Sequence, residues 1–261
     1  MIPLHSDRPR ILIEQPWVTW GLIALCATIF ALQVEVGPET SQRWVLGLGA
    51  IPAVLVGEAQ LVPALALVPD WATLITYQFL HGDAYHLIFN MAYLWVFGDK
   101  VEDAMGHLRF LVFYLLCGAL AALVHLAADP SSTVPIIGAS GAISGVLGAF
   151  LLLYPKVRIL VPLVFFIPFY LPAYLLLAFW IGYQIYSALG LGAGASPVAW
   201  WAHIGGFAVG LALVIPFRHK TIPLWGDNVL PRGLRLMPRG RWHAHNKGEV
   251  DDPPDRKRPW S

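Results

Sequence analysis

Six apolar stretches, separated by polar or proline-containing segments, dominate the pattern along the chain. They cover residues 17–36, 84–101, 108–127, 137–154, 171–189 and 200–217. Each is close to the roughly 20 apolar residues that a helix needs to cross a bilayer core. The pattern therefore predicts an all-α membrane protein with six transmembrane helices at 17–217, preceded by a short cytoplasmic N-terminus at 1–16 and followed by a hydrophilic, basic tail at 218–261.

Two further apolar segments are too short or too interrupted to count as spans. Residues 44–57 contain Gly and Pro and end at Glu58. We interpret them as part of a first loop that lies in the membrane interface, the alternative being a short extra span. Residues 159–170 carry Pro162 and Pro168, and we expect them to lead into the fifth span as an interfacial segment.

The composition agrees with a membrane protein, because 57% of the residues are hydrophobic and only 13% are charged. Soluble domains carry about 25% charged residues. The formal net charge of +1 gives no electrostatic reason to expect a nucleic-acid partner. Cys26 and Cys117 lie in apolar stretches without the spacing of metal ligands, so we interpret them as packing residues and expect no metal and no cofactor.

Basic residues predict the orientation, because short cytoplasmic loops collect Lys and Arg. If the N-terminus is cytoplasmic, Arg43 is the one of the 17 Lys and Arg residues that lies outside. Both termini are then cytoplasmic, and the second, fourth and sixth spans begin at the outer face. The late first apolar run predicts no cleaved signal peptide, and with no transit peptide evident the bacterial inner membrane is the simplest location.

Polar side chains inside these three spans share one depth. His86 and Asn90 lie near the start of the second span, Ser140 near the start of the fourth and His203 near the start of the sixth. At 1.5 Å per residue they lie roughly 5–10 Å below the outer surface. Because polar groups are costly inside a membrane, such a layer is a candidate functional site.

Ser140 lies in a Gly-Ala-Ser-Gly segment at 138–141 that opens the fourth span. Small neighbours would let a substrate backbone approach the hydroxyl, and the N–H groups at the start of a helix can stabilise an oxyanion. We therefore expect Ser140 to be a nucleophile. The alternative is a helix-packing strip, since small residues recur every four positions from Gly141 to Ala149.

His203 is followed by Gly206 and Gly210, which form a small-residue face on the sixth span. Such faces on the fourth and sixth spans would bring the helices together, with the imidazole within reach of Ser140. An imidazole is the usual activator of a serine hydroxyl. The alternative is an interfacial histidine beside the belt residues 200–201.

His86 and Asn90 are four residues apart, so they share one helix face. Both can donate hydrogen bonds to a developing oxyanion, whereas the alternative is that they join helices within the bundle. The sequence has no Asp or Glu beside His203 or at its depth in another span. We therefore expect a Ser140–His203 dyad without an acidic third member.

With these motifs in place, the chain resembles the rhomboid intramembrane serine proteases. The resemblance covers about residues 17–217, and three stretches carry it: HGDAYHLIFNMAYLWVFGDKVEDAMGHLRF (81–110), PIIGASGAISGVLGAF (135–150) and AHIGGFAVG (202–210). It implies a rhomboid-like six-helix bundle in a lipid membrane and cleavage of transmembrane protein substrates near the outer face. It also implies Ser140 as nucleophile and His203 as general base. The residues implied for the oxyanion and substrate pocket are His86, Asn90, Gly138 and Ala139.

The resemblance also implies that the fifth span and the loop at 190–199 act as a gate and cap. Gly192, Gly194 and Pro197 fit a mobile lid. Two features depart from the family. Several rhomboids carry a Tyr that stacks on the histidine where this chain has Ser144, so His203 needs other support, and the Trp-Arg pair of the first loop is reversed at 43–44. The rival interpretations are a non-proteolytic rhomboid-fold chaperone and a polytopic transporter.

Overall fold

The computed structural model describes residues 5–6, 8–162, 168–191 and 198–226. The chain divides into two units, 1–228 and 229–261, and the second unit lies outside the described residues. Most of the predicted tail is therefore outside them as well, and so are Gly192, Gly194 and Pro197 of the predicted lid.

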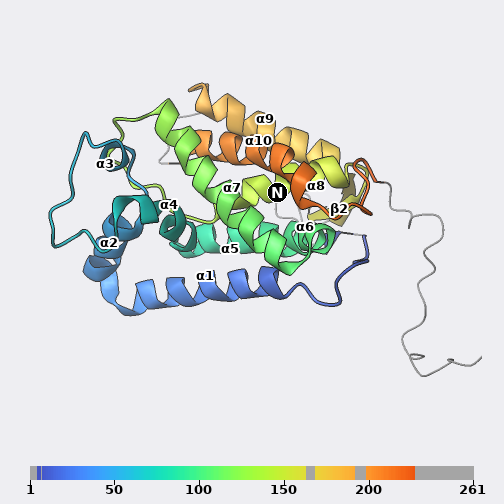
Figure 1. The fold of residues 1–261 in the computed structure, drawn as a ribbon, viewed down its shortest axis with the longest axis horizontal. Helices are drawn as coiled ribbons and strands as arrows, with labels where there is room; N and C mark the ends of the chain where they lie inside the picture. Colours follow the sequence, from blue (N-terminus) through green and yellow to red (C-terminus); the bar gives the residue numbers. More distant parts are fainter. Residues whose placement is uncertain (1–4, 7, 163–167, 192–197, 227–261) are drawn as a thin grey trace, which may run out of the picture. The chain divides into compact units, whose positions relative to one another are not determined.

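Each predicted span coincides with helical structure (Figure 1). The longer elements are α1 (Trp17–Glu35), α2 (Gly37–Leu48), α5 (Ala84–Tyr93), α6 (Asp99–Met105), α7 (His107–Ala128), α8 (Ser140–Leu153), α9 (Ala173–Ala188) and α10 (Trp200–Phe217). Short pieces are α3 (Pro52–Leu55), η1 (Asp70–Ala72), α4 (Thr73–Thr76) and η2 (Tyr77–Phe79), and the π-helical η3 (Leu94–Gly98) joins α5 to α6. Among the described residues, α1, α7 and α10 are long and apolar enough to cross a membrane by themselves.

Helix α8 lies inside the bundle, packed against α7 and α10 (Figure 1). Glycines allow this approach, as the sequence predicts. A Cβ atom on Gly206 would collide with the carbonyl oxygen of Gly141, and one on Gly210 would collide with that of Gly145. The backbones of α8 and α10 are therefore in direct contact, which a larger residue at either position of α10 would prevent.

A small antiparallel sheet, which the hydropathy pattern does not predict, stands beside the helices. β1 (His5–Ser6) pairs with β2 (Arg158–Pro162), and β2 pairs with β3 (Pro168–Pro172). The segment predicted to lead into the fifth span as interfacial chain is thus largely two paired strands. Branched and aromatic residues favour extended backbone here, and proline cannot donate to a strand ladder, so it is placed at the strand ends.

Two buried carboxylates of α6 hold the N-terminal segment. The Asp103 carboxylate accepts hydrogen bonds of 2.7–2.9 Å from the N–H groups of residues 11–13. The Glu102 carboxylate accepts from Val18 N and Thr19 N at 3.0 and 2.8 Å, and so satisfies free donors at the start of α1. It also accepts from Thr19 Oγ1 at 2.6 Å and contacts His107 Nδ1 at 2.5 Å.

The described chain after α10 also packs on the bundle. His219 N donates to Ala104 O at 2.7 Å, and Trp225 N donates to Leu152 O at 2.9 Å. Ile222 is buried. Compact structure therefore continues past the end of the sixth apolar stretch.

In the first loop, Ala50 pairs with Ile136 through backbone hydrogen bonds, which ties the loop to the segment that enters α8.

Candidate active site

Ser140 is the first residue of α8, and the turn before it requires glycine. Gly138 has a φ of +113°, a conformation that other residues rarely adopt. Its N–H donates to Tyr77 O at 2.9 Å. A Cβ atom at this position would lie 2.7 Å from ring atoms of His86. Gly138 therefore lets the imidazole of His86 lie against the start of α8.

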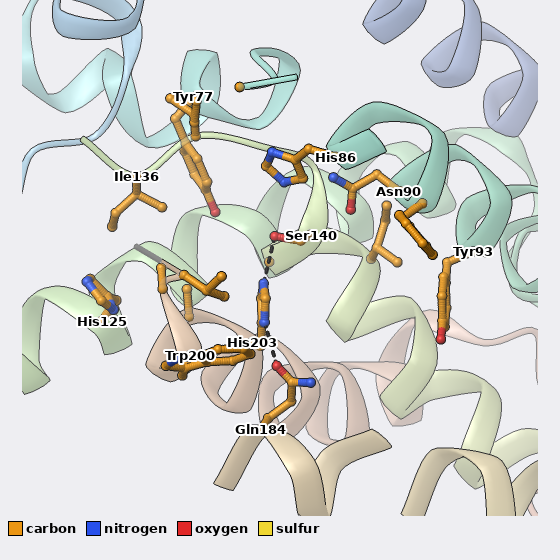
Figure 2. Close-up of a pocket in the computed structure, with 18 of the residues that line it drawn as sticks. Tyr77, His86, Asn90, Tyr93, His125, Ile136, Ser140, Gln184, Trp200 and His203 are labelled. Atoms are coloured by element: carbon orange, nitrogen blue, oxygen red, sulfur yellow. Dashed lines mark hydrogen bonds between the residues drawn. The ribbon is translucent and has the colours of Figure 1, made fainter. Parts of the chain in front are cut away.

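The side chains of Ser140 and His203 meet directly. His203 Nε2 lies 2.8 Å from Ser140 Oγ, within hydrogen-bond distance (Figure 2). The two residues come from the first turns of α8 and α10, which the glycine contacts hold together. In this geometry the hydroxyl can donate to an unprotonated Nε2, which is the arrangement of a nucleophile and its general base.

The other side of the imidazole is contacted by Gln184, Trp180 and Trp200, none of which belongs to the sequence motifs. Gln184 Oε1 of α9 lies 2.7 Å from His203 Nδ1. The rings of Trp180 and Trp200 lie 6.1 Å from the imidazole centroid, the Trp200 ring nearly perpendicular to it. The sequence does contain a sign of the role of Gln184. A glutamine inside an apolar span is costly, and such a residue is a candidate for function.

Ser144 stands where several rhomboids carry a tyrosine. Its hydroxyl donates to the carbonyl oxygen of Ser140 at 2.6 Å, one turn back along α8. It is fully buried. The contacts to His203 come instead from Gln184 and the two tryptophans, so α9 and α10 supply them in this chain.

His86 and Asn90 lie on the face of α5 that is turned toward Ser140 (Figure 2). Asp83 caps this helix, because its Oδ1 accepts from His86 N at 2.9 Å. Asn90 is buried, and its Nδ2 has no hydrogen-bond partner among the described residues. A buried donor without a partner is costly, so this amide is available to a ligand in the cavity.

A cavity of about 1030 Å³ surrounds these groups. Ser140, His203, His86, Asn90 and Gln184 all line it, and so does His125, which lies near the end of α7. The Nδ1 of His125 is buried without a hydrogen-bond partner among the described residues. Ala139 is buried, and neither it nor Gly138 is among the described residues that line the cavity, although Gly138 lies against the His86 ring that does.

His81 lies just before α5 and makes backbone contacts that support a structural role. Its backbone N–H donates to Gln33 Oε1 at 3.2 Å, and its carbonyl oxygen accepts from Gln33 Nε2 at 3.3 Å. The ring is buried, and its centroid lies 5.2 Å from that of His86. Burial lowers the pKa of His81 to about 4.

Three of the described helices are long and apolar enough to cross a membrane, and a serine and a histidine meet in a cavity among the helices. Residues 68–220, more than half of the chain, match the Rhomboid domain. The chain therefore belongs to the rhomboid family, which confirms the resemblance seen in the sequence.

Named relatives fit this assignment. The chain is 34% identical over 137 residues to "Rhomboid protease GluP" of Bacillus subtilis, covering 52% of this chain and 24% of that protein. It is 37% identical over 155 residues to "RHOMBOID-like protein 12, mitochondrial" of Arabidopsis thaliana, covering 52% and 44%. It is 32% identical over 168 residues to "Rhomboid protein 1, mitochondrial" of Saccharomyces cerevisiae, covering 63% and 45%. The chain thus spans less than half the length of these relatives.

Proposed function

We propose that this chain is a serine endopeptidase that hydrolyses peptide bonds in or next to transmembrane helices of membrane proteins, near the outer face. The observation that carries the proposal is the 2.8 Å separation of Ser140 Oγ and His203 Nε2 in a cavity. The proposed reaction needs no cofactor, because a hydroxyl, an imidazole and water suffice for peptide hydrolysis. The proposed partners of the protein are membrane-protein substrates and the surrounding lipid.

In the proposed topology the chain crosses the membrane six times with both termini in the cytoplasm. The bacterial inner membrane is the proposed location. The distribution of Lys and Arg supports the orientation, since Arg43 alone of the 17 falls outside. The first turns of α5, α8 and α10 all contribute to the site, so the site then lies near the outer face.

The reaction begins with a proton transfer. His203 Nε2 takes the proton of Ser140, and Ser140 Oγ attacks the carbonyl carbon of the scissile peptide bond. The imidazolium then protonates the leaving amine, and the acyl group remains on Ser140. Water enters from the cavity, His203 takes one of its protons, and the ester is hydrolysed to release the second product and restore the hydroxyl.

The tetrahedral oxyanion of both steps is proposed to lie between α5 and the start of α8. Asn90 Nδ2 and the His86 ring can donate from α5, and the Ser140 N–H can donate from the first turn of α8. The partial positive charge at the N-terminus of α8 also favours this anion. Each such donor stabilises a transition state by about 3–4 kcal/mol.

The substrate is proposed to enter laterally between α5 and α9, whose side chains line the cavity on both sides. Phe89 of α5 and Phe179 of α9 line it and are also exposed. A peptide bond in a helix is shielded and already hydrogen-bonded, so the entering segment must unwind before Ser140 can attack it. A cavity of about 1030 Å³ has room for an extended peptide segment.

Covalent labelling tests the proposal. The purified chain in detergent is treated with a fluorescent fluorophosphonate, and cleavage of a transmembrane reporter is measured in parallel. Wild type is expected to be labelled and active, whereas Ser140→Ala and His203→Ala lose both properties while keeping their apparent unfolding temperature. Ser144→Ala is the matched control, because it removes a hydroxyl one turn further along α8 and is expected to keep labelling.

Two outcomes contradict the proposal. Cleavage by purified Ser140→Ala would place the reaction elsewhere. A wild-type chain that is folded, unlabelled and inactive would favour a non-enzymatic rhomboid-fold protein, such as a chaperone.

A further inference from the structure

Gln184 of α9 makes a specific contact with the catalytic imidazole. Its side chain is 5% exposed, and its Oε1 lies 2.7 Å from His203 Nδ1. Its Nε2 donates to the carbonyl oxygen of Trp180 at 3.3 Å, one turn back along the helix. Because the amide nitrogen faces a carbonyl, the amide oxygen faces the imidazole and can only accept a hydrogen bond.

An acceptor at Nδ1 determines which nitrogen of the imidazole carries the proton. When Nδ1–H donates to Gln184 Oε1, the neutral ring has its lone pair on Nε2. That nitrogen is the one that lies 2.8 Å from Ser140 Oγ. The Gln184 contact therefore favours the tautomer that can accept the serine proton, and it also holds the plane of the ring. In the dyad's other tautomer, Nε2–H faces the hydroxyl and cannot act as a base.

We propose that Gln184 is a positioning residue for this dyad. Its neutral amide orients the His203 ring, as a carboxylate does in a serine–histidine–aspartate triad. The inference rests on the proposed function. A neutral acceptor suits the location, because a buried carboxylate inside a membrane span carries a large desolvation cost. The amide fixes the direction of the ring but stabilises the imidazolium less than a full charge would.

The position of Gln184 also makes the dyad dependent on α9. The nucleophile and the base come from α8 and α10, which are locked together by their glycines. The orienting oxygen comes from α9, which supplies the Trp180 ring as well. A correct dyad therefore requires α9 to be in place, in addition to the α8–α10 contact.

Two substitutions at this position separate orientation from mere packing. Gln184→Leu keeps the size and removes the acceptor, and we expect kcat to fall roughly 10- to 100-fold with little change in KM, which is part of the 10²–10⁴ that a general base supplies. Gln184→Glu restores an acceptor with a charge, and we expect it to recover most of the lost kcat. The acidic limb of its pH–rate profile moves to higher pH, because the carboxylate stabilises the protonated imidazole.

Controls isolate the effect on His203. His86 of α5 and His125 of α7 also face this imidazole and titrate, so the pH profiles are repeated in a His125→Gln background, and the shift must persist there. Tyr186→Leu is the matched control on α9, because Tyr186 is 48% exposed. It is expected to keep wild-type kcat. The apparent unfolding temperature of every variant is measured beside the rates.

The outcomes are distinct. If Gln184→Leu keeps wild-type kcat, or if Gln184→Glu matches Gln184→Leu in both rate and pH profile, Gln184 does not orient the base. If Gln184→Leu fails to fold, the Gln184→Glu profile decides alone, and an acidic limb unchanged from wild type overturns the inference. All rates in this comparison are those of labelling and cleavage that depend on Ser140. Failure of the proposed protease function is therefore recognised separately and beforehand, from wild type and Ser140→Ala.

Discussion

The helical run from α5 to α6 carries buried polar groups at both of its ends, and the two sets of groups differ in how many hydrogen-bond partners they have. Near its start, Asn90 is buried with its Nδ2 unpartnered among the described residues, and both ring nitrogens of the preceding His81 are unpartnered too. Near its other end, Glu102 and Asp103 are buried with several donors each. Asn90 and His81 leave hydrogen-bonding capacity open, whereas Glu102 and Asp103 use theirs within the fold. Asp99, at the start of α6, is intermediate, because its Oδ2 contacts Lys100 and its Oδ1 has no partner among the described residues.

This difference in hydrogen-bond partners separates residues with a proposed functional role from residues that stabilise the fold, within one helical run. A buried polar atom without a partner costs stability, and it is tolerated where a ligand supplies the missing bond. A saturated carboxylate does the reverse, because it joins α6 to the N-terminal segment and to the start of α1. Substitutions of Asn90 are therefore expected to change rates, and substitutions of Glu102 or Asp103 to change the free energy of unfolding.

The largest effect is expected at the saturated end. Glu102→Leu leaves the N–H groups of Val18 and Thr19 without their acceptor, so we expect a loss of about 2–5 kcal/mol in unfolding free energy. Apparent unfolding temperature in detergent measures it. Glu58→Leu is the matched control, because Glu58 is exposed. An unchanged unfolding temperature in Glu102→Leu would remove the distinction between the two ends.

The second effect is expected at the open end and is one of rate. Asn90→Ala removes a proposed oxyanion donor, so we expect kcat to fall roughly 10²- to 10³-fold. The unfolding temperature is expected to stay close to that of wild type, because Nδ2 has no partner to lose among the described residues. Ile88→Ala, on an exposed part of α5, is the control. A rate close to wild type in Asn90→Ala would exclude this residue from the oxyanion site.

The smallest effect is a pH dependence of stability at the open end. Burial lowers the pKa of His81 to about 4, whereas an unfolded histidine has a pKa of about 6.5. The unfolded chain therefore binds the extra proton first, and stability falls as the pH drops from 6.5 toward 4. From pH 6.5 to pH 5 this amounts to about 2 kcal/mol.

The variant His81→Asn sharpens that measurement. It is expected to lose less stability than wild type over the same pH range, whereas the exposed His219→Asn is expected to behave as wild type. Equal pH dependence of the unfolding temperature in wild type and His81→Asn would show that this ring is not buried uncharged.

The chain by itself determined the helical stretches and their order along the sequence. Apolar length predicts a helix, the first turns of three helices supply Ser140, His203 and His86, and Asn90 follows one turn after His86. The glycines at 206 and 210 also predicted the α8–α10 contact, because a small-residue face has few uses besides close packing.

Only the tertiary structure decided which residues surround Ser140 and His203. Gln184 lies in a span that is apolar all round, so no amphipathic pattern reports which way its side chain faces. The backbone N–H groups that donate to Glu102 and Asp103 likewise lie more than 80 positions away in the chain. Hydropathy records the preference of each residue for water or lipid, whereas the rotation and neighbours of a helix depend on packing against residues distant in sequence.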